Sequence, residues 1–233
     1  MTSPLAQAPD ASTPPTPAEL SAALEIEVYD QEGHTKTLGE VVQGRRTALI
    51  FIRHFWCLNC QAYVRCLSEA VPPSNLPTNV QADPVLVIGC GSYQPIKTYA
   101  EQASSLYPIY TDPSLRLHKI FRFKSNLSEG SGAQRDYMRN AGGMVSRIVG
   151  GIKGALGNLQ HLNHTGPKAL NGGEVVVSAE GECEYIYRMQ NTVDHTDISR
   201  MAELLGAKYL EPGPEAQDQK VCEDAGQGGK PKA

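Results

Sequence analysis

The chain has 233 residues and a formal net charge of −4, with 40% hydrophobic and 20% charged residues. That length fits one domain with extensions, or two small domains, and it can bury a core without covalent staples. The longest apolar runs fall far short of the ~20 residues of a membrane-spanning helix. The mild acidity offers no electrostatic footprint for nucleic acid, and six cysteines are too few for a disulfide-built secreted scaffold.

Composition separates a central body from two tails. Residues 1–18 are rich in Pro, Ala, Ser and Thr, and residues 210–233 are rich in Pro, Gly, Gln and charge. Both segments offer little to bury, so we expect disordered tails around one domain at residues 19–209. The N-terminal segment has neither the basic residues nor the apolar stretch of a targeting signal, so we expect a cytoplasmic protein.

The body alternates strand and helix signals. Two apolar runs, Thr47–Arg53 and Val85–Gly89, have the pattern of strands buried on both faces. The segments that follow them, Cys57–Ala70 and Pro95–Leu106, predict helices. The remaining predicted elements are short strands at Ile26–Tyr29 and Tyr107–Tyr110, a helix from Asp112 to Phe121 with Asp112 as its cap, a hairpin of Glu174–Ser178 and Glu182–Arg188, and a closing helix at Asp197–Leu205. This order predicts an α/β fold with a mixed sheet flanked by helices on both faces.

Residues 125–168 fall outside that pattern and form a predicted insertion before the C-terminal hairpin. The insertion opens with a Gly/Ser-rich stretch, and apolar residues then recur every three or four positions from Val145 to Leu159. Several glycines lower its helix propensity. We expect a loosely helical insertion packed on the core, and a basic amphipathic helix that contacts a membrane surface is the alternative.

The sequence Cys57-Leu58-Asn59-Cys60 stands where the first buried strand passes into its helix. Two intervening residues at a helix start allow the two sulfurs to bond, and the helix N-terminus favours a thiolate, which is the nucleophilic form. Cys57 would then attack, and Cys60, one turn further in, would resolve the product as a disulfide. Arg53 and His54 are near enough in sequence to add positive charge. In a reducing compartment such a pair indicates catalysis or metal binding rather than a structural bridge.

Zinc is the competing interpretation of these two cysteines. A structural zinc site usually needs four ligands. No His pair has ligand spacing, and the other cysteines form no second pair of this kind: Cys66, Cys90, Cys183 and Cys222. We therefore expect no metal.

Four further features have both a functional and a structural interpretation. Cys90 ends a buried strand and is a candidate accessory thiol. Trp56 could cover a substrate groove or simply pack. His195 is expected at the start of the closing helix, and Gly172-Gly173 before a strand indicates a tight turn or a close backbone approach.

Several segments together resemble one known family over roughly Leu38–Leu205. They are Phe51–Cys60 (FIRHFWCLNC), Val87–Gly89 with Ser92-Tyr93, Tyr110–Pro113, Asn171–Glu174 and Asp194-His195. The chain resembles the peroxiredoxin-like 2 proteins, of the alkyl hydroperoxide reductase/thiol-specific antioxidant type, and is most similar to their C-type branch and its fungal relatives. The resemblance implies a thioredoxin-like fold and antioxidant, thiol-dependent reduction of a peroxide or disulfide. It further implies an electron donor such as thioredoxin or glutathione, and no cofactor.

The chain also departs from related motifs. In the peroxiredoxin pattern P-x-x-x-T-x-x-C, Ile50 stands at the Pro position and His54 at the Thr position, and Asn171 stands where a second active-site Arg is expected. Thioredoxin has an acidic residue in the strand before its Cys pair, but the Thr47–Arg53 strand has none that could act on the buried Cys60. Thioredoxin also has a Pro before the later strand, where this chain has Gly172 before Glu174–Ser178. These departures leave a catalytically weak interaction module or redox sensor as the alternative function.

Overall fold

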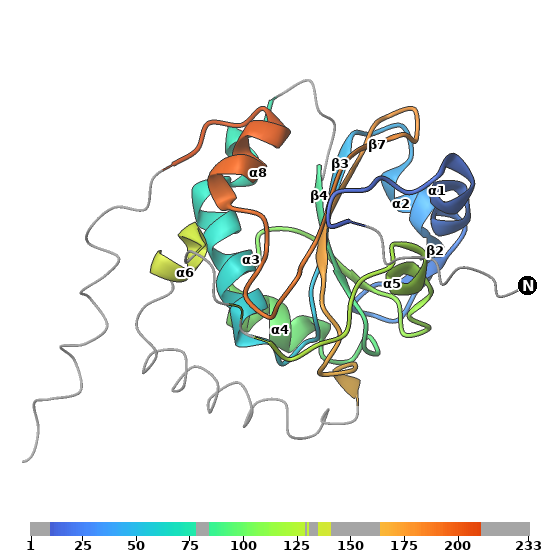
Figure 1. Cartoon of the computed structure of the whole chain (residues 1–233), viewed down its shortest axis with the longest axis horizontal. Helices are drawn as coiled ribbons and strands as arrows, with labels where there is room; N and C mark the ends of the chain where they lie inside the picture. Colours follow the sequence, from blue (N-terminus) through green and yellow to red (C-terminus); the bar gives the residue numbers. More distant parts are fainter. Residues whose placement is uncertain (1–9, 78–83, 129, 131–134, 141–163, 211–233) are drawn as a thin grey trace, which may run out of the picture.

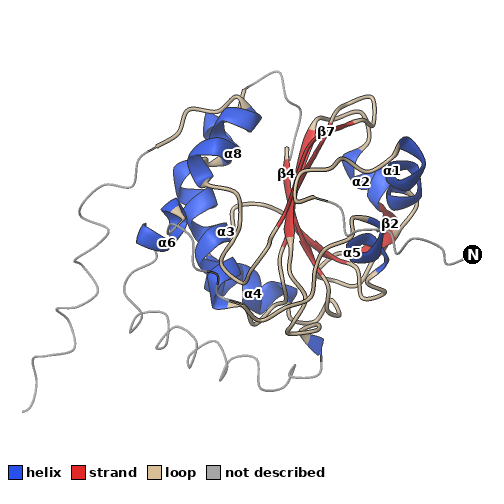
Figure 2. Ribbon diagram, viewed as in Figure 1, coloured by secondary structure: helices blue, strands red, loops and turns tan. Residues whose placement is uncertain are grey.

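The computed structural model describes residues 10–77, 84–128, 130, 135–140 and 164–210. In this part the strands form one seven-stranded sheet in the order β2-β1-β5-β4-β3-β6-β7 (Figures 1 and 2). The strands are β1 Glu27–Tyr29, β2 Thr35–Thr37, β3 Thr47–Phe51, β4 Val85–Gly89, β5 Ile109–Thr111, β6 Gly173–Val177 and β7 Cys183–Arg188. β3 and β5 run parallel to β4, whereas β6 runs antiparallel to β3 and to β7. The predicted mixed sheet is confirmed.

Helices cover both faces of this sheet, as predicted. They are α1 Pro17–Leu24, α2 Leu38–Val42, α3 Leu58–Ala70, η1 Pro73–Asn75, α4 Ile96–Ala103, α5 Arg116–Ile120, α6 Asp136–Asn140 and α8 Ile198–Leu205. Figure 2 shows α3, α4, α6 and α8 on one side of the strands and α1, α2 and α5 on the other. In the described part of the chain, no helix combines the length and the apolar character that crossing a membrane requires.

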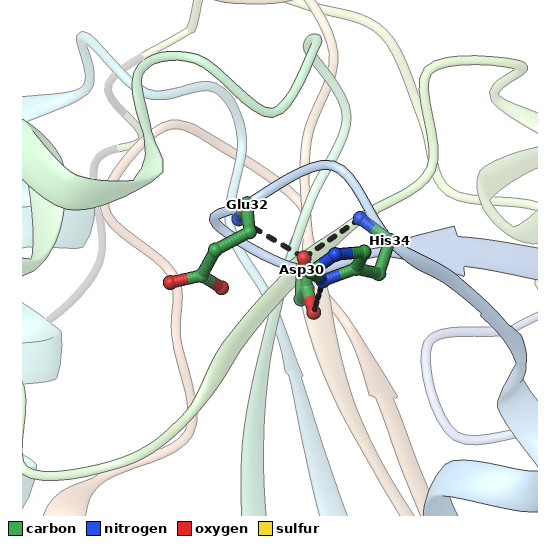
Figure 3. Close-up of side chains that lie close together, drawn as sticks. All are labelled: Asp30, Glu32 and His34. Atoms are coloured by element: carbon green, nitrogen blue, oxygen red, sulfur yellow. Dashed lines mark hydrogen bonds and ion pairs between the residues drawn. The ribbon is translucent and has the colours of Figure 1, made fainter.

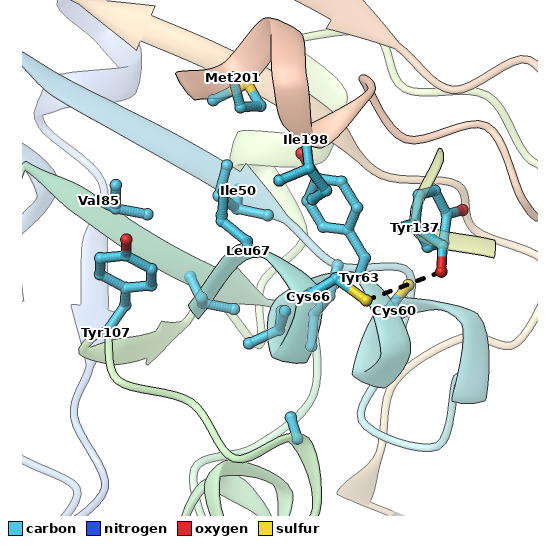
Figure 4. Close-up of a cluster of buried hydrophobic side chains, with 14 of the residues drawn as sticks. Ile50, Cys60, Tyr63, Cys66, Leu67, Val85, Tyr107, Tyr137, Ile198 and Met201 are labelled. Carbon is cyan, nitrogen blue, oxygen red and sulfur yellow. Dashed lines mark hydrogen bonds between the residues drawn. The ribbon is translucent and has the colours of Figure 1, made fainter. Parts of the chain in front are cut away.

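The two faces of the central strands supply two separate cores. Along β3, Ile50 points toward the α3 side and Leu49 toward the α1 side, because successive side chains of a strand alternate. Figure 4 shows Ile50 within the first of these cores, beside Tyr63 and Leu67 of α3. Glu174 of β6 lies opposite Ile50 in the register. A carboxylate therefore belongs to the face of the sheet that α3 covers.

Several elements differ from the prediction, including β2 and η1, which were not expected. The helices α1 and α2 were not expected, although each begins with a Thr and a Glu three residues later that form a capping box. The helix expected from Asp112 begins only at Arg116, because the Asp112 carboxylate accepts hydrogen bonds from the backbone N–H groups of Ser114 and Leu117. The bond from Ser114 forms a turn before the helix, and the bond from Leu117 satisfies an N–H group in the first turn of α5, whose N-cap position is Leu115.

Part of the predicted N-terminal tail contacts the domain. The carbonyl groups of Asp10, Ala11 and Thr13 accept hydrogen bonds from the guanidinium of Arg188, which is buried at the end of β7. Residues 1–9 and 211–233 lie outside the described residues, and so does the segment 141–163, which contains the apolar pattern of the predicted insertion. The amphipathic surface helix therefore remains a prediction.

Candidate active site

The structure places Cys57 at the N-cap of α3, directly after the loop that leaves β3. The backbone carbonyl of Cys57 accepts the first helical hydrogen bond, from the N–H of Gln61 at 3.0 Å. The first turn of α3 contains no acidic residue, so no carboxylate opposes the partial positive charge of the helix start. Cys57 is 4% exposed and Cys60 is fully buried. This is the order of accessibility that an attacking and a resolving cysteine need.

Arg53 contacts the sulfurs of both Cys57 and Cys60. Its guanidinium Nη1 lies 3.3 Å from Cys57 Sγ, and its backbone N–H donates to Cys60 Sγ at 3.4 Å. The other guanidinium nitrogens are held by Asn171 Oδ1 at 3.3 Å and by the carbonyl of Lys168 at 2.9 Å. Asn171, which stands where a second arginine was expected, thus positions the arginine that is present.

These contacts push the pKa values of the two thiols apart. The pKa of Cys57 is well below its usual range, mainly because Cys60 donates a hydrogen bond to it and also because the Arg53 guanidinium brings positive charge, although burial opposes the shift. The pKa of Cys60 is well above its usual range because the thiol is buried and hydrogen-bonds to Cys57. The site therefore favours a Cys57 thiolate beside a Cys60 thiol.

The other predicted supporting residues, His54 and Trp56, lie in the loop between β3 and α3, and the candidate accessory thiol Cys90 follows β4. Burial lowers the pKa of His54, and its ring Nδ1 accepts a hydrogen bond from the backbone N–H of Trp56 at 3.2 Å. The Trp56 ring is partly buried and has the ammonium of Lys168 5.8 Å from its centre. The Cys90 thiol donates to the carbonyl of Arg53 at 3.0 Å, and burial raises its pKa to about 12. Cys90 therefore touches the site, but its surroundings do not favour a second nucleophile.

Two residues that the sequence analysis did not place at the site extend it behind the buried cysteine: His195 contacts Cys60, and Glu174 contacts His195. Nε2 of His195 lies 3.3 Å from Cys60 Sγ, and Nδ1 of the same ring lies 2.6 Å from Glu174 Oε1. His195 lies in the loop before α8 and is fully buried, as is Glu174. β3 has no acidic residue beside Cys60. The neighbouring strand β6 supplies one, Glu174, which acts on Cys60 through the His195 imidazole. A lone Glu at the start of the apolar run Gly173–Val177 is the signal that could have indicated it.

Aromatic rings hold this imidazole in place. The ring of Tyr63 stacks on His195 with centroids 4.2 Å apart and planes 13° apart, and Tyr137 meets His195 edge-on at 6.1 Å. Figure 4 shows Cys60 and Tyr63 on α3, with Tyr137 approaching from α6. The sulfur, the imidazole and the carboxylate therefore sit in a packed interior.

The other described cysteines have structural surroundings. Cys66 donates a hydrogen bond to the carbonyl of Tyr137, and burial raises its pKa to about 11. Cys183 is half-buried on β7, and burial raises its pKa as well. The five cysteines in the described part of the chain, these two with Cys57, Cys60 and Cys90, are free thiols. Cys222 lies outside the described residues.

Among the described residues, one group of metal-ligand types gathers closely, and it does not include the two active-site cysteines. It consists of Asp30, Glu32 and His34 in the β1–β2 turn (Figure 3). The Asp30 carboxylate accepts hydrogen bonds from the backbone N–H groups of Glu32 and His34. This cluster shapes the turn, in which Gly33 adopts the left-handed conformation with φ of 87°.

A dithiol at the start of the helix that follows a central strand, in a mixed sheet of this order, defines a protein of the thioredoxin-like fold. Two solved structures from Xanthomonas campestris share this fold with TM-scores of 0.50 at 12% identity. They are a peroxiredoxin Q mutant, with 80% of this chain and 91% of that chain covered, and the bacterioferritin comigratory protein, with 88% and 96% covered.

The sequence comparisons find similar proteins within this class. The profile of the AhpC/TSA antioxidant enzymes matches residues 76–191. Peroxiredoxin-like 2C from Bos taurus is 28% identical over 210 residues, covering 88% of each chain, and the Homo sapiens protein is 28% identical over 206 residues, covering 87% of each. The chain is thus similar to the AhpC/TSA antioxidant enzymes and to the peroxiredoxin-like 2C proteins, which supports the resemblance found in the sequence.

Proposed function

We propose that the protein is a thiol-dependent oxidoreductase in which Cys57 attacks a peroxide or a disulfide and Cys60 resolves the product. One observation carries the proposal. Cys57 lies at the N-cap of α3 with the Arg53 guanidinium 3.3 Å from its sulfur, and the buried Cys60 follows one turn later. The similarity to the AhpC/TSA antioxidant enzymes supports a peroxide as substrate and a thiol as electron donor.

The reaction with a peroxide balances as follows. The Cys57 thiolate attacks one peroxide oxygen, an S–O bond forms, the O–O bond breaks, and the leaving alkoxide takes a proton to become the alcohol. Cys57 is thereby oxidised to a sulfenic acid. Cys60, as thiolate, then attacks the Cys57 sulfur, an S–S bond forms, and hydroxide leaves and becomes water. Two thiols of a donor such as glutathione or thioredoxin reduce the disulfide and are themselves oxidised.

A stopped-flow experiment tests this proposal, because Trp56 is the only tryptophan of the chain and adjoins Cys57. We expect a fluorescence change whose rate increases with peroxide concentration, and a Cys57–Cys60 disulfide in mass maps of the product. Cys57→Ser should abolish oxidation, whereas Cys60→Ser should leave a sulfenic acid that dimedone traps on Cys57.

Cys66→Ser is the matched control, since Cys66 is a buried thiol of the same helix that touches neither sulfur of the pair. This variant should behave as the wild type. The proposal fails if Cys57 has the pKa of an ordinary thiol and forms no disulfide with Cys60 under peroxide or oxidised glutathione.

A redox sensor is the second candidate, favoured by the 4% exposure of Cys57. Such a small opening suits a thiol that is oxidised once and then changes a partner's binding. Steady-state turnover with peroxide and a thiol donor distinguishes the two candidates, since a sensor would form the disulfide but would be re-reduced too slowly to cycle.

A further inference from the structure

We propose that His195, oriented by Glu174, is the proton acceptor and donor for Cys60 in the redox cycle. The inference rests on the proposed function and extends it to a residue that does not belong to the Cys57–Cys60 motif. It is carried by a line of three buried groups: Cys60 Sγ, the His195 imidazole 3.3 Å away and the Glu174 carboxylate 2.6 Å beyond it.

The resolving step needs such a group. A thiol must lose its proton before it can attack, because the thiolate is the nucleophile. Cys60 is fully buried, so water has no open path to it, and burial and the bond to Cys57 raise its pKa. The Arg53 backbone N–H at 3.4 Å stabilises a thiolate on Cys60 but cannot accept its proton. The imidazole Nε2 can accept that proton.

Glu174 sets the tautomer that this role requires. With Oε1 of the carboxylate 2.6 Å from Nδ1, the ring donates its Nδ1–H to Glu174 and leaves the Nε2 lone pair facing the Cys60 sulfur. Once Cys57 is oxidised and no longer a thiolate, the Cys60 S–H can turn from Cys57 to this lone pair. The other carboxylate oxygen, Oε2, accepts from the backbone N–H of Thr196 at 3.1 Å and from its hydroxyl at 2.7 Å. Glu174 is therefore fixed at both oxygens, and the stacked Tyr63 ring fixes the plane of the imidazole.

The proton then balances in both directions. During resolution the Cys60 S–H proton moves to His195 Nε2, the thiolate forms the S–S bond with Cys57, and the imidazolium proton converts the departing hydroxide to water. During reduction the donor thiol gives up its proton, which His195 takes up at Nε2, and the donor thiolate attacks Cys57. The S–S bond breaks, and Cys60 leaves as a thiolate that receives this proton from His195. The imidazolium that exists in between is stabilised by the Glu174 carboxylate.

Two substitutions test the role. His195→Gln should leave the peroxide-dependent phase unchanged and slow disulfide formation by about 10²-fold, a common magnitude for general base catalysis. The sulfenic acid on Cys57 should then accumulate and be trapped by dimedone. Glu174→Gln keeps an oxygen for Nδ1–H but removes the charge, and should slow the same step by about tenfold. A structural role for His195 and Glu174 predicts wild-type resolution in any folded variant.

The pH profile provides the readout that a packing defect would not change. The groups that face His195 are Glu174 from β6, Cys60 and Tyr63 from α3 and Tyr137 from α6. In the wild type the resolution step should not require prior ionisation of the Cys60 thiol, because the imidazole accepts its proton. In His195→Gln the rate should instead rise with pH toward the ionisation of the Cys60 thiol itself, whose pKa is raised by burial. Identical profiles for the two proteins would overturn the proposal.

A measurement on the wild type covers the case in which both variants fail to fold. In reduced protein labelled with ¹⁵N-histidine, NMR should report His195 with its proton on Nδ1 and none on Nε2. A proton on Nε2 of the neutral ring would refute the inference, since no lone pair would then face Cys60. If the wild type forms no Cys57–Cys60 disulfide at all, the proposed function fails. If it does, and both variants resolve at the wild-type rate, only the role of His195 fails.

Discussion

Replacing Cys60 by alanine should raise the pKa of Cys57, whereas replacing it by serine should keep that pKa low. The hydrogen bond from Cys60 is the largest cause of the low pKa of Cys57. Alanine removes the donor, but the hydroxyl of serine retains one. Neither variant can form the Cys57–Cys60 disulfide. The two variants therefore differ only in how strongly residue 60 stabilises the Cys57 thiolate.

The magnitude follows from the strength of one charge-assisted hydrogen bond. Such a bond contributes about 1.5–3 kcal/mol, and one pKa unit corresponds to about 1.36 kcal/mol. Cys60→Ala should therefore raise the pKa of Cys57 by about one to two units. Arg53, His54 and the start of α3 remain in place, so the pKa should stay at or below that of an ordinary cysteine.

The assay is the pH dependence of alkylation by iodoacetamide between about pH 4 and pH 10, read by mass spectrometry of the Cys57 peptide. Burial raises the pKa values of Cys66 and Cys90, so they should react more slowly. Cys66→Ala is the matched control, because it empties a similar volume on the same helix without touching Cys57. If the alanine and serine variants give the same Cys57 pKa, the hydrogen bond from Cys60 is not its cause.

Three further substitutions have defined outcomes. Arg53→Gln should raise the pKa of Cys57 by about one unit or less, measured in the same alkylation assay, because the guanidinium contributes after the Cys60 bond. Gly172→Ala should destabilise the fold by about 1–3 kcal/mol or more in urea unfolding, since its Cβ would lie 1.8 Å from the Phe51 carbonyl oxygen. The wild type should lose roughly 3 kcal/mol of stability between pH 7 and pH 4, because burial lowers the pKa of His118 to about 4. His118→Phe should lack that loss.

Controls and contrary results separate these effects from general damage. Arg65→Gln removes the same charge from α3, where the side chain contacts the Gln102 carbonyl, and should leave the pKa of Cys57 unchanged. The sign of the His118 effect follows from proton binding. Between pH 6.5 and about 4 the unfolded chain takes up the proton and the native state does not, so acid favours unfolding. An equal loss of stability in His118→Phe would contradict this assignment.

The fold was largely predictable because its signals are local. The apolar runs of β3 and β4 and the turn residues of the β6–β7 hairpin each lie within a few consecutive positions. Parallel crossovers followed by an antiparallel hairpin then predict a mixed sheet, whereas the order of its strands came from the structure. The starts of α1 and α2 were also encoded locally, in two capping boxes. The prediction missed these helices because it relied on the hydrophobic pattern and did not search for capping boxes. The close approach expected at Gly172 is confirmed, because a Cβ at this position would lie 1.8 Å from the Phe51 carbonyl oxygen.

The candidate site was predictable only where it is continuous in the sequence. Cys57, Cys60, Arg53 and His54 fall within one strand–loop–helix segment, so their proximity follows from local geometry. The contact between Arg53 and Asn171 joins residues 118 positions apart. In the sequence Asn171 could only be recognised as a missing arginine, because its contact depends on how β6 is paired with β3.

The sequence by itself therefore determined a dithiol at the N-terminus of a helix in an α/β domain, since both depend on short-range spacing and on buried strands. Only the tertiary structure decided what surrounds the second thiol. His195 lies 135 positions from Cys60, and Glu174 reaches it because the register of β6 against β3 turns that side chain toward α3. A shift of one residue in that register would turn the Glu174 carboxylate to the opposite face of the sheet. The His195 ring beside Cys60 would then lack its carboxylate partner.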